Sequence, residues 1–355
     1  MPYMQHLYKT TLALLAAFFF IIAVPYAQAD ATTTPARQSA GGQNYLRIFY
    51  YRNGATARAS FLKNYKSVDV LAPQSYELDE YGFLKGSVNN TILAFALKNN
   101  IKVMPLVTNG VFDRKSGQSV LDDMSKKNNA IREMIAEAKK FGYWGWQIDF
   151  EQIDASYRDK FSSFVYRVGR VFRKNGLVLS VAVAAQHSQD PSAYPDGTWQ
   201  NMVGVYDFAA LARGADFLTI MSYDDPNSKG PVASLPWTKQ VLDYTLQFVP
   251  PEKISLGLGL YYWKWNDKTT KLVEIGGYSG IKNVFNKYYY TSGYSEENEA
   301  PFIKYKIKKI PYTLWYENGK SIGKKLELIN NYGLAGFSAW ALGLEVPSVQ
   351  DLFKK

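Results

Sequence analysis

The chain has no cysteine and only two histidines, His6 and His187, among its 355 residues. Without cysteine there can be no disulfide bond, no thiolate metal site and no cysteine nucleophile. A metal site built from several histidines is excluded by number, and a serine–histidine triad would have to use His187. Stability must therefore come from packing, and the chemistry must come from other side chains.

Long apolar runs are also scarce. One extends from Thr10 to Val24, between Lys9 and Pro25, and the small residues Ala27 and Ala29 have the spacing that a signal peptidase reads. The run is shorter than the roughly 20 residues that span a bilayer. We therefore expect a cleaved signal peptide over residues 1–29, with an uncleaved anchor as the alternative.

Export has two consequences for the mature chain. We expect a secreted, periplasmic or cell-envelope protein without stable membrane insertion after signal cleavage. Residues 30–44 are small and polar and predict a flexible leader, and regular structure is expected to begin at Tyr45.

Acidic residues are fewer than basic ones, which gives a formal net charge of +10. A basic exported protein can be held near anionic envelope polymers, although a solvated basic face is the simpler alternative. Much of this charge lies between Lys304 and Lys325, and no basic stripe follows a predicted helix. We therefore expect no nucleic-acid partner.

Short apolar, β-branched segments alternate with segments of helical periodicity. Residues 131–138 place apolar side chains at i, i+3, i+4 and i+7, and the segments 161–172 and 322–329 repeat the pattern. Eight such strand–helix units predict an α/β fold, a closed (β/α)8 TIM barrel. An open doubly wound sheet is the alternative, but no glycine-rich phosphate loop follows the first strand. The predicted strands are Leu46–Tyr50, Val68–Gln74, Lys102–Val107, Gly145–Glu151, Leu177–Ala184, Phe217–Tyr223, Ile254–Leu260 and Ala335–Ala341.

The spacing of about 75 residues between the last two strands is too long for one helix. This stretch holds the aromatic runs 261–265 and 288–290, and hairpin-like pieces at 302–306 and 312–316 around residues 317–319. We predict a small α+β insertion at about 262–318 within a single domain, 45–355. Its tyrosines would either offer platforms for sugar rings or form the insertion's own core.

The segment from Tyr143 to Glu151 carries the clearest chemical signal, because strand side chains alternate between two faces. The face expected to pack against the outer helices is apolar and consists of Trp144, Trp146, Ile148 and Phe150. The face expected to point into the barrel consists of Gly145, Gln147, Asp149 and Glu151. Inward polar groups are costly unless they are paired or used, and Glu151 lies at the strand end where such barrels hold their active sites.

Asp149 and Glu151 would lie about 7 Å apart along the strand. An ionised Asp149 would disfavour ionisation of Glu151 and raise its pKa toward that of a general acid. An interior ion-pair layer is the alternative, but no lysine or arginine occupies the matching inward positions of the other predicted strands.

The segment 143–151 resembles the D-G-x-D-x-D-x-E signature of glycoside hydrolase family 18, the chitinase-like family. Other segments resemble that family in order and spacing, closest to its spore-germination branch of cortex-lytic N-acetylglucosaminidases. These are residues 70–76, 104–109, 206–208 with 216–224, and 336–343, so that the likeness covers Tyr45 to Phe353. The sequence departs from the family pattern at Trp144, at Gln147 and at 107–110, where Val-Thr-Asn-Gly replaces S-x-G-G.

The resemblance implies a retaining, substrate-assisted mechanism without metal or cofactor. Glu151 would be the general acid, Asp149 would orient the substrate's acetamido group, and Tyr223 would hydrogen-bond its carbonyl. Trp340 would form the hydrophobic floor under the sugar. Further expected sugar or neighbouring contacts are Gln147, Asp224, Met221 and Tyr76.

The expected activity is hydrolysis of β-1,4-linked N-acetylglucosamine polymers by a monomer, with peptidoglycan preferred over chitin. A chitinase or chito-oligosaccharide hydrolase is the alternative within the enzyme class. A catalytically inactive, glycan-binding lectin or a protein-binding inhibitor is the alternative from another class. The presence of Asp149, Glu151 and Tyr223 favours an enzyme.

Overall fold

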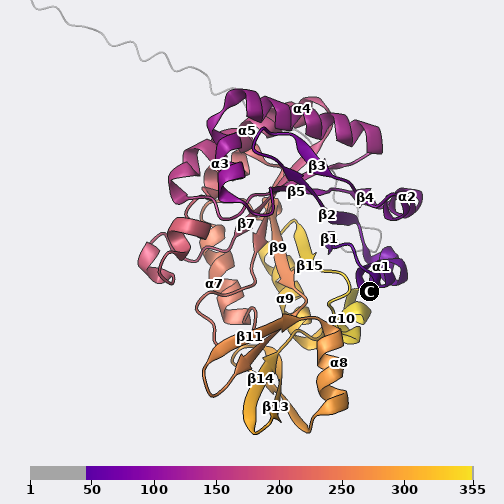
Figure 1. Cartoon of the computed structure of the whole chain (residues 1–355), viewed down its shortest axis with the longest axis vertical. Helices are drawn as coiled ribbons and strands as arrows, with labels where there is room; N and C mark the ends of the chain where they lie inside the picture. The colour runs from indigo at the N-terminus through magenta and orange to yellow at the C-terminus, as the bar shows by residue number, and fades with distance from the viewer. Residues whose placement is uncertain (1–44, 354–355) are drawn as a thin grey trace, which may run out of the picture. The chain divides into compact units, whose positions relative to one another are not determined.

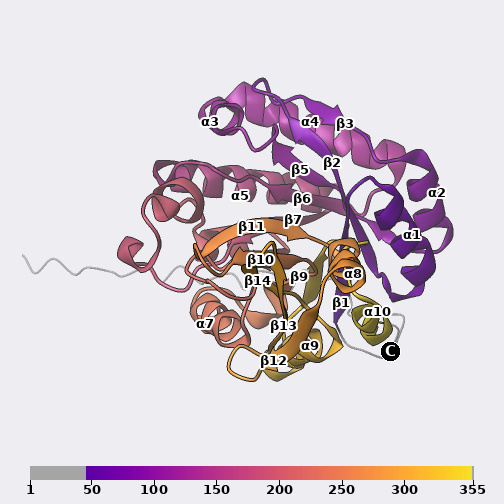
Figure 2. The same ribbon diagram turned by 60° about the horizontal axis from the view of Figure 1, so that its bottom comes forward.

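The computed structural model describes residues 45–353. The predicted signal peptide at 1–29 and the predicted leader at 30–44 lie outside the described residues. Eight parallel strands form a closed ring, since β1 (Leu46–Tyr51) pairs with β15 (Gly336–Trp340) on one side and with β2 (Val70–Leu78) on the other (Figures 1 and 2). The (β/α)8 TIM barrel is thus confirmed.

The barrel strands follow the predicted segments closely. In ring order they are β1 (Leu46–Tyr51), β2 (Val70–Leu78), β5 (Leu106–Asn109), β6 (Gly145–Asp149), β7 (Val178–Ala184), β8 (Phe217–Met221), β9 (Ile254–Gly259) and β15 (Gly336–Trp340). The third predicted strand is divided at Pro105, which has no N–H for the ladder, and its first part is β4 (Lys102–Val103). The short β3 (Leu84–Gly86) pairs antiparallel with the end of β2.

Helices surround the barrel and connect its strands (Figure 2). Gly142 and Gly333, predicted as helix stops, follow α4 (Met124–Phe141) and α9 (Gly319–Tyr332) with φ of 71° and 67°, a left-handed conformation that glycine adopts without strain. The helices of the barrel are α1 (Ala55–Asn64), α2 (Asn90–Lys98), α3 (Arg114–Asp122), α4 (Met124–Phe141), α5 (Arg158–Lys174), α6 (Phe208–Gly214), α7 (Leu235–Thr245), α9 (Gly319–Tyr332) and α10 (Pro347–Phe353). Single helical turns lie at Tyr65–Ser67, Ala155–Tyr157, Pro191–Ala193, Trp199–Val203 and Pro251–Lys253. From residue 45 to residue 353, no helix is long and apolar enough to cross a membrane.

The insertion between the last two barrel strands is an antiparallel sheet with one helix, as predicted. Its strands run in the order β11-β10-β14-β13-β12. The bounds are β10 (Tyr262–Asn266), β11 (Lys271–Gly276), α8 (Tyr278–Lys287), β12 (Tyr290–Ser295), β13 (Ala300–Ile307) and β14 (Ile310–Trp315). The hairpin turns at Lys308 and Lys309, whereas Asn318 caps the N-terminus of α9.

The inside of the barrel is layered. An apolar cluster that includes Ile48, Met104 and Phe217 fills the end where the strands begin. Above it lies a polar layer in which Gln147 donates to the hydroxyls of Ser180 and Thr219, both at 2.9 Å. The third layer opens at the C-terminal ends of the strands, where TIM barrels hold their active sites.

The position of Trp144 differs from the prediction. Trp144, predicted on the outer face, instead packs against the inner apolar cluster, with Lys102 Nζ 4.6 Å from its ring centroid. Trp144 precedes β6, so the alternation of that strand does not reach it.

Between β1 and β2, the Arg47 guanidinium contacts both carboxylate oxygens of Asp69 at 2.9–3.0 Å, and both side chains are more than 90% buried.

Candidate active site

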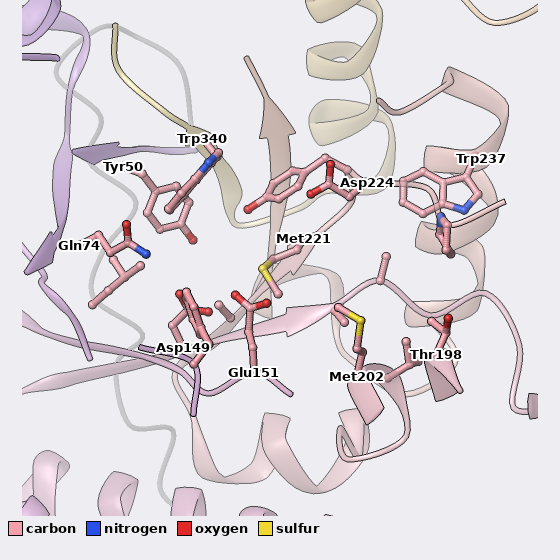
Figure 3. A pocket seen from close by; sticks show the side chains of 18 residues that line it. Tyr50, Gln74, Asp149, Glu151, Thr198, Met202, Met221, Asp224, Trp237 and Trp340 are labelled. Carbon is pink, nitrogen blue, oxygen red and sulfur yellow. The ribbon is translucent and has the colours of Figure 1, made fainter. Parts of the chain in front are cut away.

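A hollow of about 320 Å³ opens at the C-terminal end of the barrel. Figure 3 shows Asp149 and Glu151 on one side of it, Trp340 and Tyr50 on another, and Met221 between them. Of the residues predicted for the site, six line this hollow: Asp149, Glu151, Met221, Tyr223, Asp224 and Trp340.

The backbone around Glu151 is fixed by side chains from outside its own strand. Glu151 follows β6 by two residues, and its N–H and C=O are both bonded to the buried amide of Asn109, each at 2.9 Å. The Tyr206 hydroxyl donates to the Phe150 carbonyl at 2.7 Å, and Arg114 Nε donates to the Gln152 carbonyl at 2.9 Å. Three consecutive peptide units are therefore anchored, which limits the positions that the Glu151 carboxyl can occupy.

The pKa of Glu151 is raised to about 7, first by burial and then by the negative charge of Asp224. The sequence analysis predicted a raised pKa for Glu151 but attributed it to the charge of Asp149. A carboxyl group with a pKa near neutrality is protonated often enough to donate a proton at pH 7.

Asp149 is the last residue of β6 and is buried. Burial, and next the charge of Glu151, raise its pKa well above the usual range. Its Oδ1 is buried without a hydrogen-bond partner, and Asp149 forms no ion pair within residues 45–353. Asp149 is therefore not part of an interior ion-pair layer. Its Oδ1 can accept a hydrogen bond from a group that enters the hollow.

Tyr223 and Asp224 come from the loop that follows β8. The pKa of Tyr223 is raised well above its usual range by burial, so its hydroxyl remains a proton donor. Its ring fits because Gly257 has no side chain: a Cβ there would lie 2.3 Å from the Ile220 oxygen and 3.0 Å from the Tyr223 ring. Asp224 has a φ of 62° and accepts a hydrogen bond from the Tyr261 hydroxyl.

Trp340 ends β15 and forms an apolar wall of the hollow. The ring centroids of Trp340 and Tyr50 are 5.1 Å apart. The Arg52 guanidinium lies over the face of the Trp340 ring, 5.9 Å from its centroid. Aromatic faces of this kind offer apolar contact to the C–H surface of a sugar.

Two predicted contacts do not line the hollow. Gln147 is fully buried in the polar layer beneath it, where its Oε1 accepts from the Tyr50 hydroxyl at 2.6 Å. Tyr76 points outward, and its hydroxyl bonds with Tyr143 at 2.8 Å and with Glu137 of α4 at 3.0 Å. Direct contact of either side chain with a sugar in this hollow is thus not supported.

The outward direction of Tyr76 has a local cause. β2 shifts register between Gln74 and Tyr76, which pair with the consecutive residues Leu106 and Val107 of β5. Such a bulge inserts one residue and exchanges the two faces of the strand beyond it. Gln74 therefore faces the hollow, and Tyr76 joins the outer core.

Several lining residues were missed by the sequence analysis. Tyr50 could have been found, because it ends the first strand on the same face as Ile48. Others come from loops or helix starts that have no strand periodicity: Phe112, Thr198, Met202, Pro226 and Trp237. In the described part of the chain, no group of three or more histidine, cysteine or acidic residues could hold a metal ion.

Comparison with known proteins identifies a family. The model of glycosyl hydrolases family 18 matches residues 42–345. The uncharacterized glycosylase YvbX of Bacillus subtilis is 27% identical over 315 residues, which cover 86% of this chain and 90% of that protein.

Two further similarities are informative. The cortical fragment-lytic enzyme of Bacillus subtilis is 26% identical over 77% of this chain but only 64% of its own length, so this chain spans less than two thirds of that enzyme. The crystal structure of a chitinase from Chromobacterium violaceum superimposes with a TM-score of 0.77 at 26% identity, covering 87% of this chain and 98% of that one.

Proposed function

The chain belongs to glycosyl hydrolase family 18, and we propose that it cleaves β-1,4-linked N-acetylglucosamine glycans, with peptidoglycan-like polymers preferred. The family establishes a glycoside hydrolase. The linkage, the sugar, the mechanism and the export of the enzyme are the proposed parts.

One observation carries the proposal. The unpartnered Oδ1 of Asp149 lies beside Glu151, whose pKa is about 7, in the same hollow. A buried acceptor without a partner costs roughly 1–3 kcal/mol. A substrate that donates an N–H to Asp149 would remove that cost. If the same substrate places its leaving oxygen against Glu151, this oxygen can receive the Glu151 proton.

An N-acetylglucosamine residue meets both requirements. In the proposed first step its acetamido oxygen forms a bond to the anomeric carbon while the glycosidic C–O bond breaks, and the leaving oxygen takes the Glu151 proton. Asp149 accepts a hydrogen bond from the acetamido N–H and stabilises the oxazolinium ion, and Tyr223 donates to the acetamido oxygen. Glu151 then removes a proton from water, whose oxygen bonds to the anomeric carbon while the bond to the acetamido oxygen breaks, which restores the acetamido group with overall retention.

Trp340 would lie against the apolar face of that sugar, opposite the acids. The contribution of Asp224 would be electrostatic, because its charge raises the pKa of Glu151. These roles need no metal and no cofactor. We further propose that Gln147 acts indirectly, through its hydrogen bond with Tyr50 beneath the sugar.

The preference for peptidoglycan is supported by a relative and by charge. The similar Bacillus subtilis enzyme is named for lysis of cortical fragments, and the net charge of +10 suits an anionic polymer. Chitin is the second candidate, favoured by the Chromobacterium violaceum chitinase of similar structure. An enzyme of either kind would be exported to reach its polymer, which agrees with the predicted signal at 1–29.

Sugar release tests the proposal. The protein without residues 1–29 is incubated with purified peptidoglycan and with chito-oligosaccharides, Glu151→Gln serves as the blank, and new reducing ends and their anomeric configuration are measured. We expect retention, and a higher kcat/KM on soluble peptidoglycan fragments than on chito-oligosaccharides. Inversion would refute the substrate-assisted mechanism, and a preference for chito-oligosaccharides would establish the second candidate.

A further inference from the structure

A second hollow, of about 530 Å³, lies beside the catalytic one at the C-terminal ends of β1, β2 and β5. The two hollows share Gln74 and Phe112 as lining residues, so one continues into the other. Figure 3 shows Gln74 at the end of the catalytic hollow near Trp340, whereas Trp237 lies at the other end. A polymer held in the catalytic hollow can therefore place a neighbouring sugar in the second one.

Unusual backbone geometry shapes the second hollow. Ser75 is the extra residue of the β2 bulge, and its hydroxyl is buried without a hydrogen-bond partner. Gly86 of β3 has a φ of 115°, and a Cβ there would lie 2.0 Å from the Ser75 oxygen, so glycine lets β3 approach the bulge. Phe112 has a φ of 54°, which a bulky residue rarely adopts. Such conformations gather at functional sites, which marks this hollow as a candidate binding site.

The two hollows differ in charge. The charged side chains that line the catalytic hollow are all acidic, namely Asp149, Glu151 and Asp224. They would repel a carboxylate carried by the substrate. Arg52 lines the second hollow and lies over the ring of Trp340, which is a wall of the catalytic one. A positive charge therefore stands at the junction of the two hollows.

The Arg52 guanidinium is available to a ligand. Arg52 is exposed, and it forms no ion pair within residues 45–353. Its planar N–H fork matches the two oxygens of a carboxylate. Tyr51 pairs with Pro73 across β1 and β2, so the next residues, Arg52 and Gln74, lie level with each other, and both line the second hollow. The Gln74 amide can supply a further N–H to the same ligand.

The other charges of the second hollow lie at its outer end. Glu77 and Lys85 line it and are direct partners across the β2–β3 pair, so Lys85 offsets the charge of Glu77. Lys85 Nζ also lies 3.6 Å from a carboxylate oxygen of Asp79, which leaves it less available than Arg52. Glu77 is three residues beyond Gln74, roughly 10 Å along the strand. The inner end of the hollow, at Arg52, is therefore the place for an anionic group.

We propose that Arg52, with Gln74 beside it, binds a carboxylate carried by the sugar next to the cleaved one and so selects acidic glycans. The inference rests on the proposed function, because this sugar belongs to the polymer that the barrel cleaves. In peptidoglycan every second sugar bears a lactyl group, whose carboxylate is either free or joined to a peptide that has carboxylates of its own. Chito-oligosaccharides have neither. The Ser75 hydroxyl bonds to the same sugar.

Arg52→Gln tests the charge. The substrates are peptide-free peptidoglycan fragments with a free lactyl carboxylate, the same fragments with that carboxylate converted to an amide, and chito-oligosaccharides. We expect the ratio of kcat/KM on the free-carboxylate fragments to kcat/KM on chito-oligosaccharides to fall about 10-fold, the lower end for a hydrogen bond to a charged group because Arg52 is exposed. Conversion to the amide should lower the ratio of the parent by a similar factor.

Two further variants show whether the charge or the fold is responsible. Arg52→Lys keeps the positive charge and should hold the ratio within about threefold of the parent. Arg132→Gln is the matched control, because Arg132 is an exposed arginine of α4 that lines neither hollow. Its ratio should equal that of the parent.

Fragments that retain their peptides identify the source of the carboxylate. A fall of the Arg52→Gln ratio on peptide-free fragments alone assigns the lactyl carboxylate. A fall on peptide-bearing fragments alone assigns a carboxylate of the peptide.

Binding is measured separately by calorimetry in the Glu151→Gln protein. Adding Arg52→Gln should weaken the Kd for a carboxylate-bearing fragment about 10-fold and leave the Kd for the amidated fragment unchanged. Unchanged ratios on all carboxylate-bearing fragments, an equal fall for Arg132→Gln, or equal weakening for the amidated fragment would overturn this inference. If the parent protein releases sugar from no glycan, the proposed activity fails, yet calorimetry still decides whether Arg52 binds a carboxylate.

Discussion

Replacing Asp224 with asparagine removes a negative charge from the catalytic hollow and preserves the shape of the side chain. The asparagine oxygen can still accept the hydrogen bond from the Tyr261 hydroxyl. Because the charge of Asp224 is the second cause, after burial, of the raised pKa of Glu151, the variant should have a Glu151 pKa below 7. Glu151 must be protonated to act as an acid. As the pH rises, the variant should therefore lose activity at a lower pH than the parent does.

The size of the effect follows from the charge. A neighbouring charge shifts a pKa by about 1–3 pH units. The lower limit of about one unit applies here, because the charge of Asp224 is the smaller of the two causes, after burial. A fall from about 7 to about 6 would reduce the protonated fraction at pH 7 from about one half to about one tenth, a roughly fivefold loss, but would change it little at pH 5.5.

The assay is kcat/KM on soluble peptidoglycan fragments between pH 4.5 and 8.5. Asp225→Asn is the matched control, since Asp225 is the adjacent residue but does not line the hollow. We expect the alkaline limb to move down for Asp224→Asn and to stay in place for Asp225→Asn. An unmoved limb, or an equal loss at every pH, would refute the electrostatic role of Asp224.

Three further predictions concern positioning, charge and stability. Asn109→Ala removes both hydrogen bonds to the Glu151 backbone, and we expect kcat to fall about 10–100-fold with KM within threefold; an unchanged kcat would show that this anchor is unnecessary. Asp149→Asn should lower kcat by about 10²–10³-fold in initial-rate assays, because asparagine cannot become negatively charged opposite the positive intermediate, and activity within threefold of the parent would contradict that role. Arg47→Met leaves the Asp69 carboxylate buried and unpaired, so chemical denaturation should show a loss of about 3–5 kcal/mol in unfolding free energy; a loss below about 1 kcal/mol would argue against the importance of this pair.

The barrel could be predicted because its determinants are local. Most of the strands are short apolar runs, and glycines such as Gly142 and Gly333 end helices in a conformation that other residues avoid. The placement of Asp149 and Glu151 at one strand end follows from the same alternation. The comparisons with family 18 then confirmed the fold that these patterns predicted.

The remaining errors arise where the alternation of a strand fails. The bulge between Gln74 and Tyr76 exchanges the faces of β2. No residue type in the sequence predicts this bulge. Trp144 lies just before β6, so its direction is not set by that strand. Met202 comes from a single helical turn, and Phe112 and Pro226 come from loops; their positions depend on tertiary packing that a single sequence does not reveal.

The central claim is that Glu151 donates the proton that cleaves the glycan. Its direct test compares the initial rate of sugar release from peptidoglycan by the parent protein and by Glu151→Gln, with equal denaturation midpoints showing that both are folded. We predict a loss of about 10²–10⁴-fold, the usual worth of a general acid. A variant that retains more than about one tenth of the parent rate would contradict the assignment and require another proton donor in the hollow.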